Sequence, residues 1–196
     1  FENSNSIIES HDKFRIGHFG LFNELRDHAE MWKALNVTLS RNKNFKEDLE
    51  IYFSGPTHKN FHKNLKRHHL DSYLNYFEWN NLEKMKQEML KCNVLIVSQS
   101  NTEDAMGWLP AKFFEYLGTG IPIVAIGRKN SDLSKMILKY QCGVFFEFNK
   151  LNNLSSCLSN YYDKYLKKEK QLRNNNVDFF SWENQASNLV DLLKNL

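Results

Sequence analysis

Short apolar runs alternate along the chain with longer segments in which apolar residues recur every three or four positions. The short runs predict strands, and the longer segments predict helices with one face turned to a core. Because strands and helices alternate, we expect right-handed βαβ units and a mostly parallel sheet. The expected strands cover residues 14–19, 49–53, 73–77, 94–97, 121–126 and 144–146. The first helix is expected to bury Leu25, Ala29, Trp32, Leu35 and Leu39.

This pattern predicts one doubly wound, Rossmann-like α/β domain over residues 13–196, with a six-stranded sheet and two extra C-terminal helices. Residues 1–12 are polar and aperiodic, and we interpret them as a linker or tail. The last helix, capped by Ser181, carries an apolar stripe that should pack on the sheet or against a missing half: Trp182, Ala186, Leu189 and Leu193. Ligands of such folds bind outside the carboxyl ends of the strands, near a switch in strand order.

The run from residue 110 to residue 124 reads P-A-K-F-F-E-Y-L-G-T-G-I-P-I-V and predicts a helix followed by a strand. Pro110 suits the first helical turn, where its missing N–H would have no partner. Gly118 and Gly120 are expected to end the helix in left-handed conformations. The residues expected to face the core form a stripe at helical spacing: Phe113, Phe114 and Leu117.

Two charged residues lie off this stripe. Lys112 and Glu115 are three positions apart and therefore neighbours on the helix surface. Lys112 falls in the first turn, where the helix dipole already presents positive charge. A bound anion at the helix start would compensate the charge of Lys112 and the positive end of the helix dipole. The alternative is that Lys112 and Glu115 form a solvated surface pair.

Composition narrows the classes of protein. The chain has 26 Lys and Arg against 23 Asp and Glu, and this net charge of +3 is too small to indicate a nucleic-acid-binding domain. Cys92, Cys142 and Cys157 are far apart, and we expect buried free thiols, not a disulfide frame or a zinc site. No apolar run approaches the ~20 residues of a membrane-spanning helix.

Familiar cofactor motifs are absent from the sequence. No G-x-G-x-x-G follows the first strand and no G-x-x-x-x-G-K-[ST] occurs, which argues against a dinucleotide cofactor and a P-loop enzyme. His58 and His62 are spaced for a zinc site but lack a third ligand, so we expect no metal. The loops after the strands instead suit a phosphorylated, hydroxyl-rich ligand. Arg26 lies near the start of the first helix, where amides favour anions, and Gly20 lets the backbone approach the ligand.

Other loops supply groups for the rest of such a ligand. Phe77 and Trp79 could flank a base, and Asn101, with its neighbours Ser100 and Thr102, offers short polar groups. Glu115 can accept two hydrogen bonds, which suits the paired hydroxyls of a ribose.

The run F-R-I-G-H-F-G, followed five residues later by R-D, and the run over residues 110–124 together resemble the donor-binding half of GT-B glycosyltransferases. Within them they are most similar to the retaining family 4, which includes capsule, lipopolysaccharide and cell-wall enzymes. The resemblance covers roughly Lys13 to Leu193. It implies a C-terminal domain that binds a UDP- or GDP-sugar as substrate, with no further cofactor. The acceptor site and the catalytic base would belong to an N-terminal domain that is absent here, so this chain alone would be inactive.

The resemblance also assigns roles to residues. It implies that Glu115 binds the ribose hydroxyls, Arg26 the diphosphate, residues 77–79 the base, and residues 101–109 the sugar and phosphates. Many relatives carry a second glutamate where this chain has Gly107, and an arginine where it has Leu21. Lys112 would replace part of that missing charge. The resemblance implies a cytoplasmic location, with peripheral association at the inner face of the membrane, through the missing half, left open.

Two alternatives remain at this point. A sugar-nucleotide epimerase has the same two-domain fold and would differ in its product. A non-catalytic module that binds a nucleotide or another protein is also compatible with the loss of the glutamate at Gly107.

Overall fold

The computed structural model describes residues 12–78, 81–169 and 179–194. Its centre is a six-stranded sheet with the strand order β3-β2-β1-β4-β5-β6. Each of the pairings between these strands is parallel. The strands are β1 (Phe14–Phe19), β2 (Leu49–Ser54), β3 (Leu74–Tyr76), β4 (Val94–Ser98), β5 (Ile123–Gly127) and β6 (Gly143–Glu147). The doubly wound α/β fold expected from the sequence is therefore confirmed.

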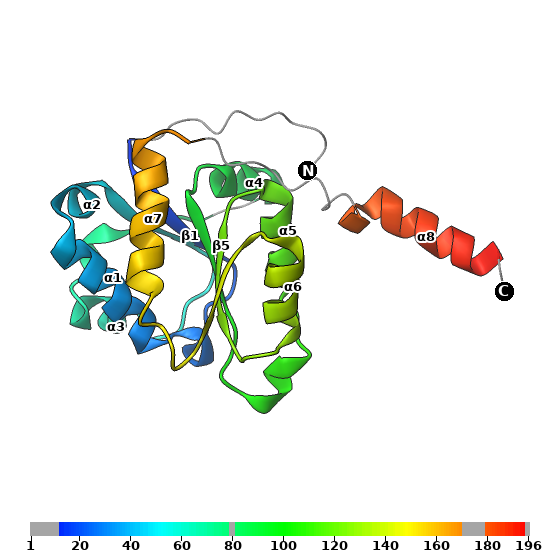
Figure 1. Ribbon diagram of the computed structural model, residues 1–196, viewed down its shortest axis with the longest axis horizontal. Helices are drawn as coiled ribbons and strands as arrows, with labels where there is room; N and C mark the ends of the chain where they lie inside the picture. Colours follow the sequence, from blue (N-terminus) through cyan, green and yellow to red (C-terminus); the bar gives the residue numbers. More distant parts are fainter. Residues whose placement is uncertain (1–11, 79–80, 170–178, 195–196) are drawn as a thin grey trace.

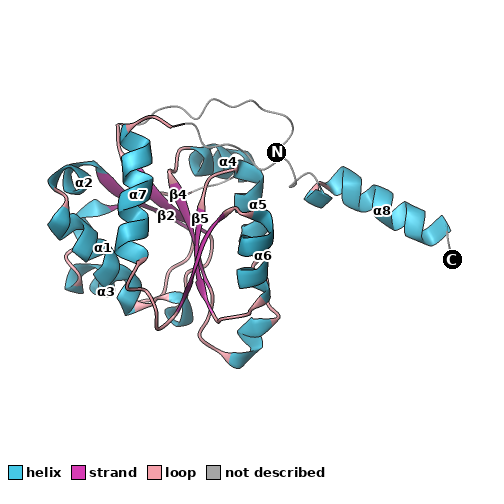
Figure 2. Ribbon diagram, in the orientation of Figure 1, coloured by secondary structure: helices cyan, strands magenta, loops and turns pink. Residues whose placement is uncertain are grey.

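Helices cover both faces of the sheet (Figures 1 and 2). One face is covered by α1 (Ala29–Arg41), α2 (Lys43–Asp48), α3 (Phe61–Arg67) and α7 (Leu154–Leu166). The other is covered by α4 (Leu82–Leu90), α5 (Ala111–Thr119) and α6 (Asp132–Tyr140). Three short 3-10 helices, η1 (Glu24–Arg26), η2 (Asp71–Tyr73) and η3 (Glu103–Met106), lie in the connections, and α8 (Trp182–Lys194) follows at the C-terminal end.

The alternation of side chains along each strand divides the core into two clusters. In β4, Val94 and Ile96 pack in the cluster under α1 and α7, whereas Leu95 and Val97 pack in the cluster under α4, α5 and α6. Both faces of the strand are buried, which explains why β4 is a continuous apolar run in the sequence.

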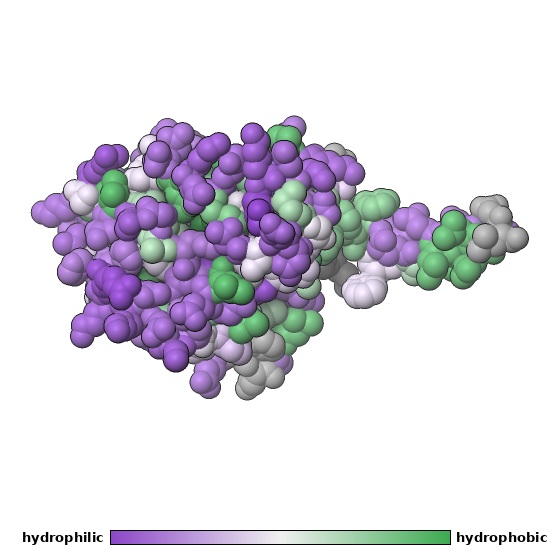
Figure 3. All heavy atoms as spheres, turned by 90° about the horizontal axis from the view of Figure 1, so that it is seen from below, coloured by the Kyte–Doolittle hydropathy of each residue, from purple (hydrophilic) through white to green (hydrophobic). Residues whose placement is uncertain are grey.

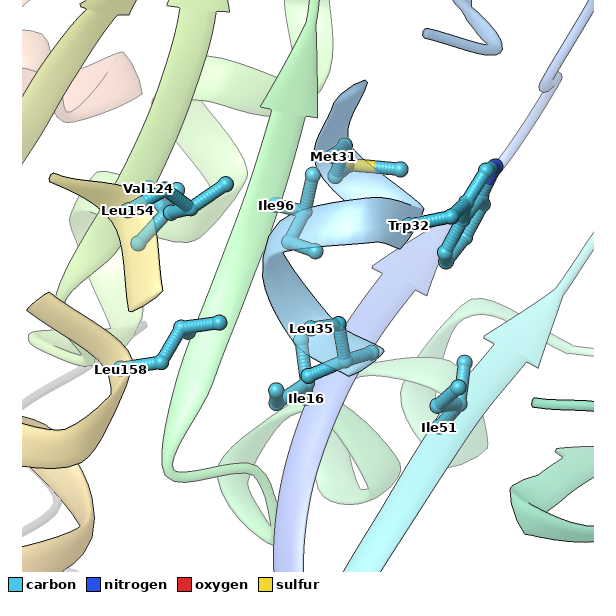
Figure 4. Close-up of a pocket in the computed structure, with 9 residues that line it drawn as sticks. All are labelled: Ile16, Met31, Trp32, Leu35, Ile51, Ile96, Val124, Leu154 and Leu158. Carbon is cyan, nitrogen blue, oxygen red and sulfur yellow. The ribbon is translucent and has the colours of Figure 1, made fainter. Parts of the chain in front are cut away.

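The first cluster contains a small cavity between the sheet and helices α1 and α7 (Figure 4). Its lining is apolar and consists of Ile16, Met31, Trp32, Leu35, Ile51, Ile96, Val124, Leu154 and Leu158. A cavity without polar partners does not hold ordered water, and this one lies inside the core, away from the ends of the strands. We interpret it as a packing defect and not as a ligand site.

For the last helix, the structure excludes one of the two expected positions of its apolar stripe, and packing against a missing half stays a prediction. Trp182 is 88% exposed and α8 has no buried residue, so its apolar stripe does not pack on the sheet. Figure 1 shows α8 extending away from the domain. The contact with the domain lies just before the helix. There the ring of Phe180 packs 5.0 Å from the ring of Phe114 and 5.2 Å from the ring of Tyr140. The physical reason is that helices α1 to α7 already cover both faces of the sheet.

Several details of the helices also differ from the predictions. Leu25 belongs to η1 and is 54% exposed, so it is not part of the α1 face. The short helix α2 was not expected. Gly118 lies inside α5, and Gly120 alone ends it, with a φ of 75°. In α5, Phe113 is fully buried as expected, but so is Tyr116, while Phe114 is 37% exposed.

The described helices include none that is both long enough and apolar enough to cross a bilayer. The three cysteines are free thiols, and Cys92 alone among them is fully buried. Of residues 1–12, which the sequence suggests as a linker or tail, residues 1–11 lie outside the described part of the chain.

The contrast between two tryptophans tests the position of α8. Trp32→Ala should lower the free energy of unfolding by about 3 to 5 kcal/mol, because Trp32 is 1% exposed in the main core. Trp182→Ala should change it by less than about 0.5 kcal/mol, as is usual for surface positions. Urea denaturation of both variants measures this, and a large loss for Trp182→Ala would mean that α8 packs on the domain in solution.

Candidate functional site

The switch point of the sheet lies between β1 and β4, which are neighbours in space but not in sequence. The chain leaves β1 toward one face of the sheet and leaves β4 toward the other, and folds of this class bind ligands at the carboxyl ends of such strands. We call the region around these two strand ends the crevice. This end of the molecule points downward in Figure 1. Figure 3 views it from that side and shows a mostly hydrophilic surface with small, separate hydrophobic spots.

Lys112 reaches this crevice from the first turn of α5. Its Nζ lies 3.0 Å from Nε2 of His18 and 3.4 Å from the backbone carbonyl of Leu21. His18 is fully buried in β1, and its Nδ1 lies 3.1 Å from the carbonyl of Ile96. A carbonyl can only accept, so we assign the imidazole proton to Nδ1, which leaves Nε2 to accept from Lys112.

Burial changes the acid–base properties of these groups. The pKa of His18 lies well below its usual range, mainly because the ring is buried and secondly because of the charge of Lys112. His18 is therefore neutral. Burial, and next the charge of Arg26, lower the pKa of Lys112 to about 7, although Glu115 acts in the opposite direction. Neither Lys112 nor Arg26 has an ion pair among the described residues. The crevice therefore brings an amine and a guanidinium together without an ion-paired carboxylate.

Arg26 is held at the other side of the crevice. Its Nη1 donates to the carbonyl of Leu21 at 2.8 Å, and its guanidinium lies over the Trp108 ring, 4.7 Å from the ring centre. Its Nε is buried without a hydrogen-bond partner in the described structure. Burial lowers the pKa of Arg26, but a guanidinium stays protonated in proteins. Arg26 therefore carries a buried N–H group that has no hydrogen-bond partner in the described structure.

Backbone contacts hold the loops after β1, β2 and β4 together. The N–H of Gly20 donates to Ser54 at 2.7 Å, and the Ser98 hydroxyl donates to the Arg26 carbonyl at 2.7 Å. Gly20 and Gly55 have φ angles of 103° and 107°, and a Cβ on Gly55 would lie 2.8 Å from the backbone of Gly20. Glycine at Gly55 thus lets the two loops touch. A Cβ on Gly20 would lie 3.5 Å from the Lys112 Nζ, so glycine also leaves space beside that amine.

Tyr116 fixes α5 on the end of β1. Its buried hydroxyl accepts from the backbone N–H of Phe19 at 2.8 Å. Lys112 and Tyr116 are four residues apart and therefore project from the same side of the helix. The hydrogen bond of Tyr116 consequently sets the position from which Lys112 reaches His18.

Gln99 shapes the loop after β4. Its Nε2 donates to the carbonyls of Ala105 at 3.1 Å and Trp108 at 2.9 Å, and its backbone carbonyl accepts from Nε2 of His28 at 3.0 Å. Its Oε1 lies 2.2 Å from the position that a Cβ on Gly127 would take. These contacts hold the loop in the conformation that places Trp108 over Arg26.

The structure brings together three of the site residues suggested by the sequence: Gly20, Arg26 and Lys112. Glu115 is exposed on α5 and forms no ion pair with Lys112, whose nitrogen is bonded to His18 instead, so the surface-pair alternative is wrong.

The remaining predicted residues lie outside this cluster or outside the description. The ring of Phe77 stacks on Tyr52 at 4.9 Å, half-buried in the core. Asn101 is exposed in the loop after β4, and Trp79 lies outside the described residues. The roles suggested for Phe77, Asn101 and Trp79 stay predictions.

Sequence reasoning missed four residues that build the crevice: His18, Gln99, Trp108 and Tyr116. A histidine inside an otherwise apolar strand is a signal that could have drawn attention to His18. Gln99, directly after the apolar strand β4, is a weaker signal of the same kind. The described residues contain no group of three or more His, Cys, Asp or Glu side chains placed to hold a metal ion.

Comparison with solved structures identifies the fold. The chain is similar to the C-terminal domain of LpcC, a glycosyl transferase group 1 family protein from Francisella tularensis, with a TM-score of 0.61 and 13% identity over 86% of each chain. It is similar to HepE from Anabaena, in complex with UDP-glucose, with a TM-score of 0.70 and 15% identity over 94% of this chain and 50% of that one.

A third similar structure is a mutant of TarM from S. aureus in complex with fondaparinux, α-GlcNAc-glycerol and UDP. Here the TM-score is 0.67 and the identity 12%, over 93% of this chain and 36% of that one. No family model matches the sequence, and a search of curated proteins finds no match. At these identities the likeness shows the fold, which is that of the C-terminal domains of GT-B glycosyltransferases. The chain spans half or less of the length of HepE and TarM.

Two glycines test the packing of the loops at this site. Gly55→Ala should lower the free energy of unfolding by about 1 to 3 kcal/mol, the usual cost of holding a side chain in such a backbone conformation, and should shift the amide signal of Gly20. Gly107→Ala is the matched control, because a Cβ there meets nothing within 4 Å. Denaturation and NMR spectra measure both effects, and equal stability of the two variants would contradict the contact.

Tyr116→Phe tests the connection between α5 and β1. The variant keeps the ring but leaves the buried N–H of Phe19 without its acceptor, so the free energy of unfolding should fall by about 1 to 3 kcal/mol. Tyr73→Phe is the control, since the described structure gives the Tyr73 hydroxyl no hydrogen bond. If both changes have the same small effect, the hydroxyl of Tyr116 does not hold the helix.

Proposed function

We propose that this chain is the donor-binding domain of a glycosyltransferase and binds the diphosphate of a UDP- or GDP-sugar at the β1/β4 switch point. The observation that carries this proposal is the meeting of Arg26 and Lys112 in a crevice without a protein counter-ion. When both groups are charged they repel each other, and a bound dianion removes that repulsion.

The start of α5 adds to the attraction for an anion. The helix begins after Pro110, and no side chain caps its first turn. Apart from Phe113, whose N–H donates to the carbonyl of Pro110 at 2.9 Å, the first N–H groups of a helix have no intrahelical partner, and here they lie with the positive end of the helix dipole at the crevice. Backbone amides at a helix start are a common binding site for phosphate. With Arg26 and Lys112 they give the diphosphate partners on two sides.

The other predicted residues would serve the rest of the donor. Glu115 is exposed on α5, one turn beyond Lys112, and its two oxygens can accept from the ribose hydroxyls. The segment of Phe77 and Trp79 follows β3 and would hold the base, while Asn101, in the loop after β4, would approach the sugar. These assignments follow from the resemblance of the sequence and from the positions of the loops.

In the reaction, the bond between the sugar and the diphosphate breaks and the electron pair leaves with the phosphate oxygen. Positive groups at that oxygen stabilise the charge that develops on it. Here Arg26 and the protonated amine of Lys112 are those groups. The acceptor and any base belong, in this proposal, to a second domain, so this chain alone should bind the donor without transferring the sugar. We propose a retaining outcome and a cytoplasmic location on the resemblance alone.

Titration calorimetry with UDP and with uridine tests the assignment. Arg26→Ala should weaken the binding of UDP about ten- to a hundredfold and leave uridine unchanged, because a charge-assisted hydrogen bond contributes about 1.5 to 3 kcal/mol. Glu115→Gln should weaken the binding of both UDP and uridine. Added salt should weaken the binding of UDP to the parent chain, as the substitution Arg26→Ala should.

Arg67→Ala and Glu47→Gln are the matched controls, because both residues are exposed and lie on α3 and α2, near the amino ends of the strands. Neither should change the affinity for UDP. If Arg26→Ala and Glu115→Gln bind UDP and GDP as well as the parent chain does, the proposed function is wrong.

A further inference from the structure

Lys112 lacks a negative partner in the described structure. Its nitrogen is bonded to two neutral acceptors, Nε2 of His18 and the carbonyl of Leu21. The charged groups that act on it are Arg26 from η1 and Glu115 from its own helix. Glu115 is exposed and is not within ion-pair distance of the amine. A protonated amine in this position would therefore face Arg26 with little compensation.

We propose that Lys112 is a neutral amine bonded to His18 when the site is empty, and that it takes up one proton from water when a sugar nucleotide binds. The proton joins the lone pair of Nζ and returns to water when the ligand leaves. The ammonium then has three N–H groups, of which two reach His18 and Leu21 and the third is free for a phosphate oxygen. This inference rests on the proposed function and adds a coupling between donor binding and protonation.

The surroundings of the amine support both states. In the empty site, burial and Arg26 lower the pKa of Lys112 to about 7, so near neutral pH much of it is uncharged. A diphosphate offsets the charge of Arg26 and attracts the ammonium directly, and both effects raise the pKa of Lys112. Binding and protonation then favour each other by the same free energy.

His18 cannot take this proton in place of Lys112. Its Nδ1 is bonded to the carbonyl of Ile96 and its Nε2 accepts from Lys112, so a second ring proton would break that contact. The ring is also fully buried, stacked on Phe53 at 5.0 Å and in edge contact with Phe22 at 4.9 Å. His18 is the fixed acceptor that holds the amine in both states.

The sign of the effect follows from linkage. Because the pKa of Lys112 is higher in the complex than in the empty site, affinity is greatest below about pH 7 and falls as pH rises above that value. The fall approaches tenfold per pH unit until the pKa of the complex is reached. Uridine, which has no phosphate, should show no such dependence.

Calorimetry with UDP-glucose tests the coupling. This ligand is suitable because its diphosphate is esterified at both ends and does not titrate near neutral pH. Measured in buffers of different ionisation enthalpy, binding at about pH 8 should take up nearly one proton, and at about pH 6 almost none, since Lys112 is then already protonated. Lys112→Arg should bind without proton uptake at either pH. Lys66→Arg, at an exposed position on α3, should behave like the parent chain.

A second measurement needs no ligand. In competitive acetylation read by mass spectrometry, Lys112 of the free protein should become reactive with a midpoint near 7. A midpoint near the ordinary lysine value of about 10.4 would overturn the inference whatever the nucleotide does. Binding of UDP-glucose without proton uptake at about pH 8, or equal uptake by Lys112→Arg, would overturn it while leaving the proposed function intact. No binding at either pH would reject the proposed function first, and this inference with it.

Discussion

Burial of both faces of the sheet is the constraint on which the rest of this structure depends. Helices α1, α2, α3 and α7 cover one face, and α4, α5 and α6 cover the other. Polar chemistry is therefore displaced to the ends of the strands, where the backbone turns and side chains can reach solvent. At the β1/β4 switch point the loops diverge, and there the structure places Arg26, Lys112 and the open start of α5.

The same site works against the stability of the empty domain. A half-buried amine beside a guanidinium, and a buried Nε without a partner, are arrangements that a domain selected for stability alone would lack. Hydrogen bonds from Tyr116, Ser98 and Gln99 hold the surrounding backbone in place despite this cost. A site that is already ordered loses less conformational entropy when a ligand binds.

Sequence patterns predicted the parts of this molecule that depend on local order. The strands, the motif helix and the presence of Lys112 in its first turn follow from periodicity and from Pro110 and Gly120. The contacts that complete the site are not local: Lys112 meets His18 across 94 positions, and Ser98 meets Arg26 across 72. Periodicity left two partners open for the stripe of α8 for a related reason, because it shows that a face is apolar but not what covers it.

The contact between Gly20 and Gly55 also affects how this domain can change during evolution. Each loop is pressed against the backbone of the other, with no room for a side chain at Gly55. An insertion in either loop would separate them and move Arg26 away from the crevice. A Cβ on Gly107 meets nothing within 4 Å, so a side chain could be added there without disturbing either loop. Changes in what the site binds would therefore arise more easily by a substitution at Gly107 than by altering the loops after β1 and β2.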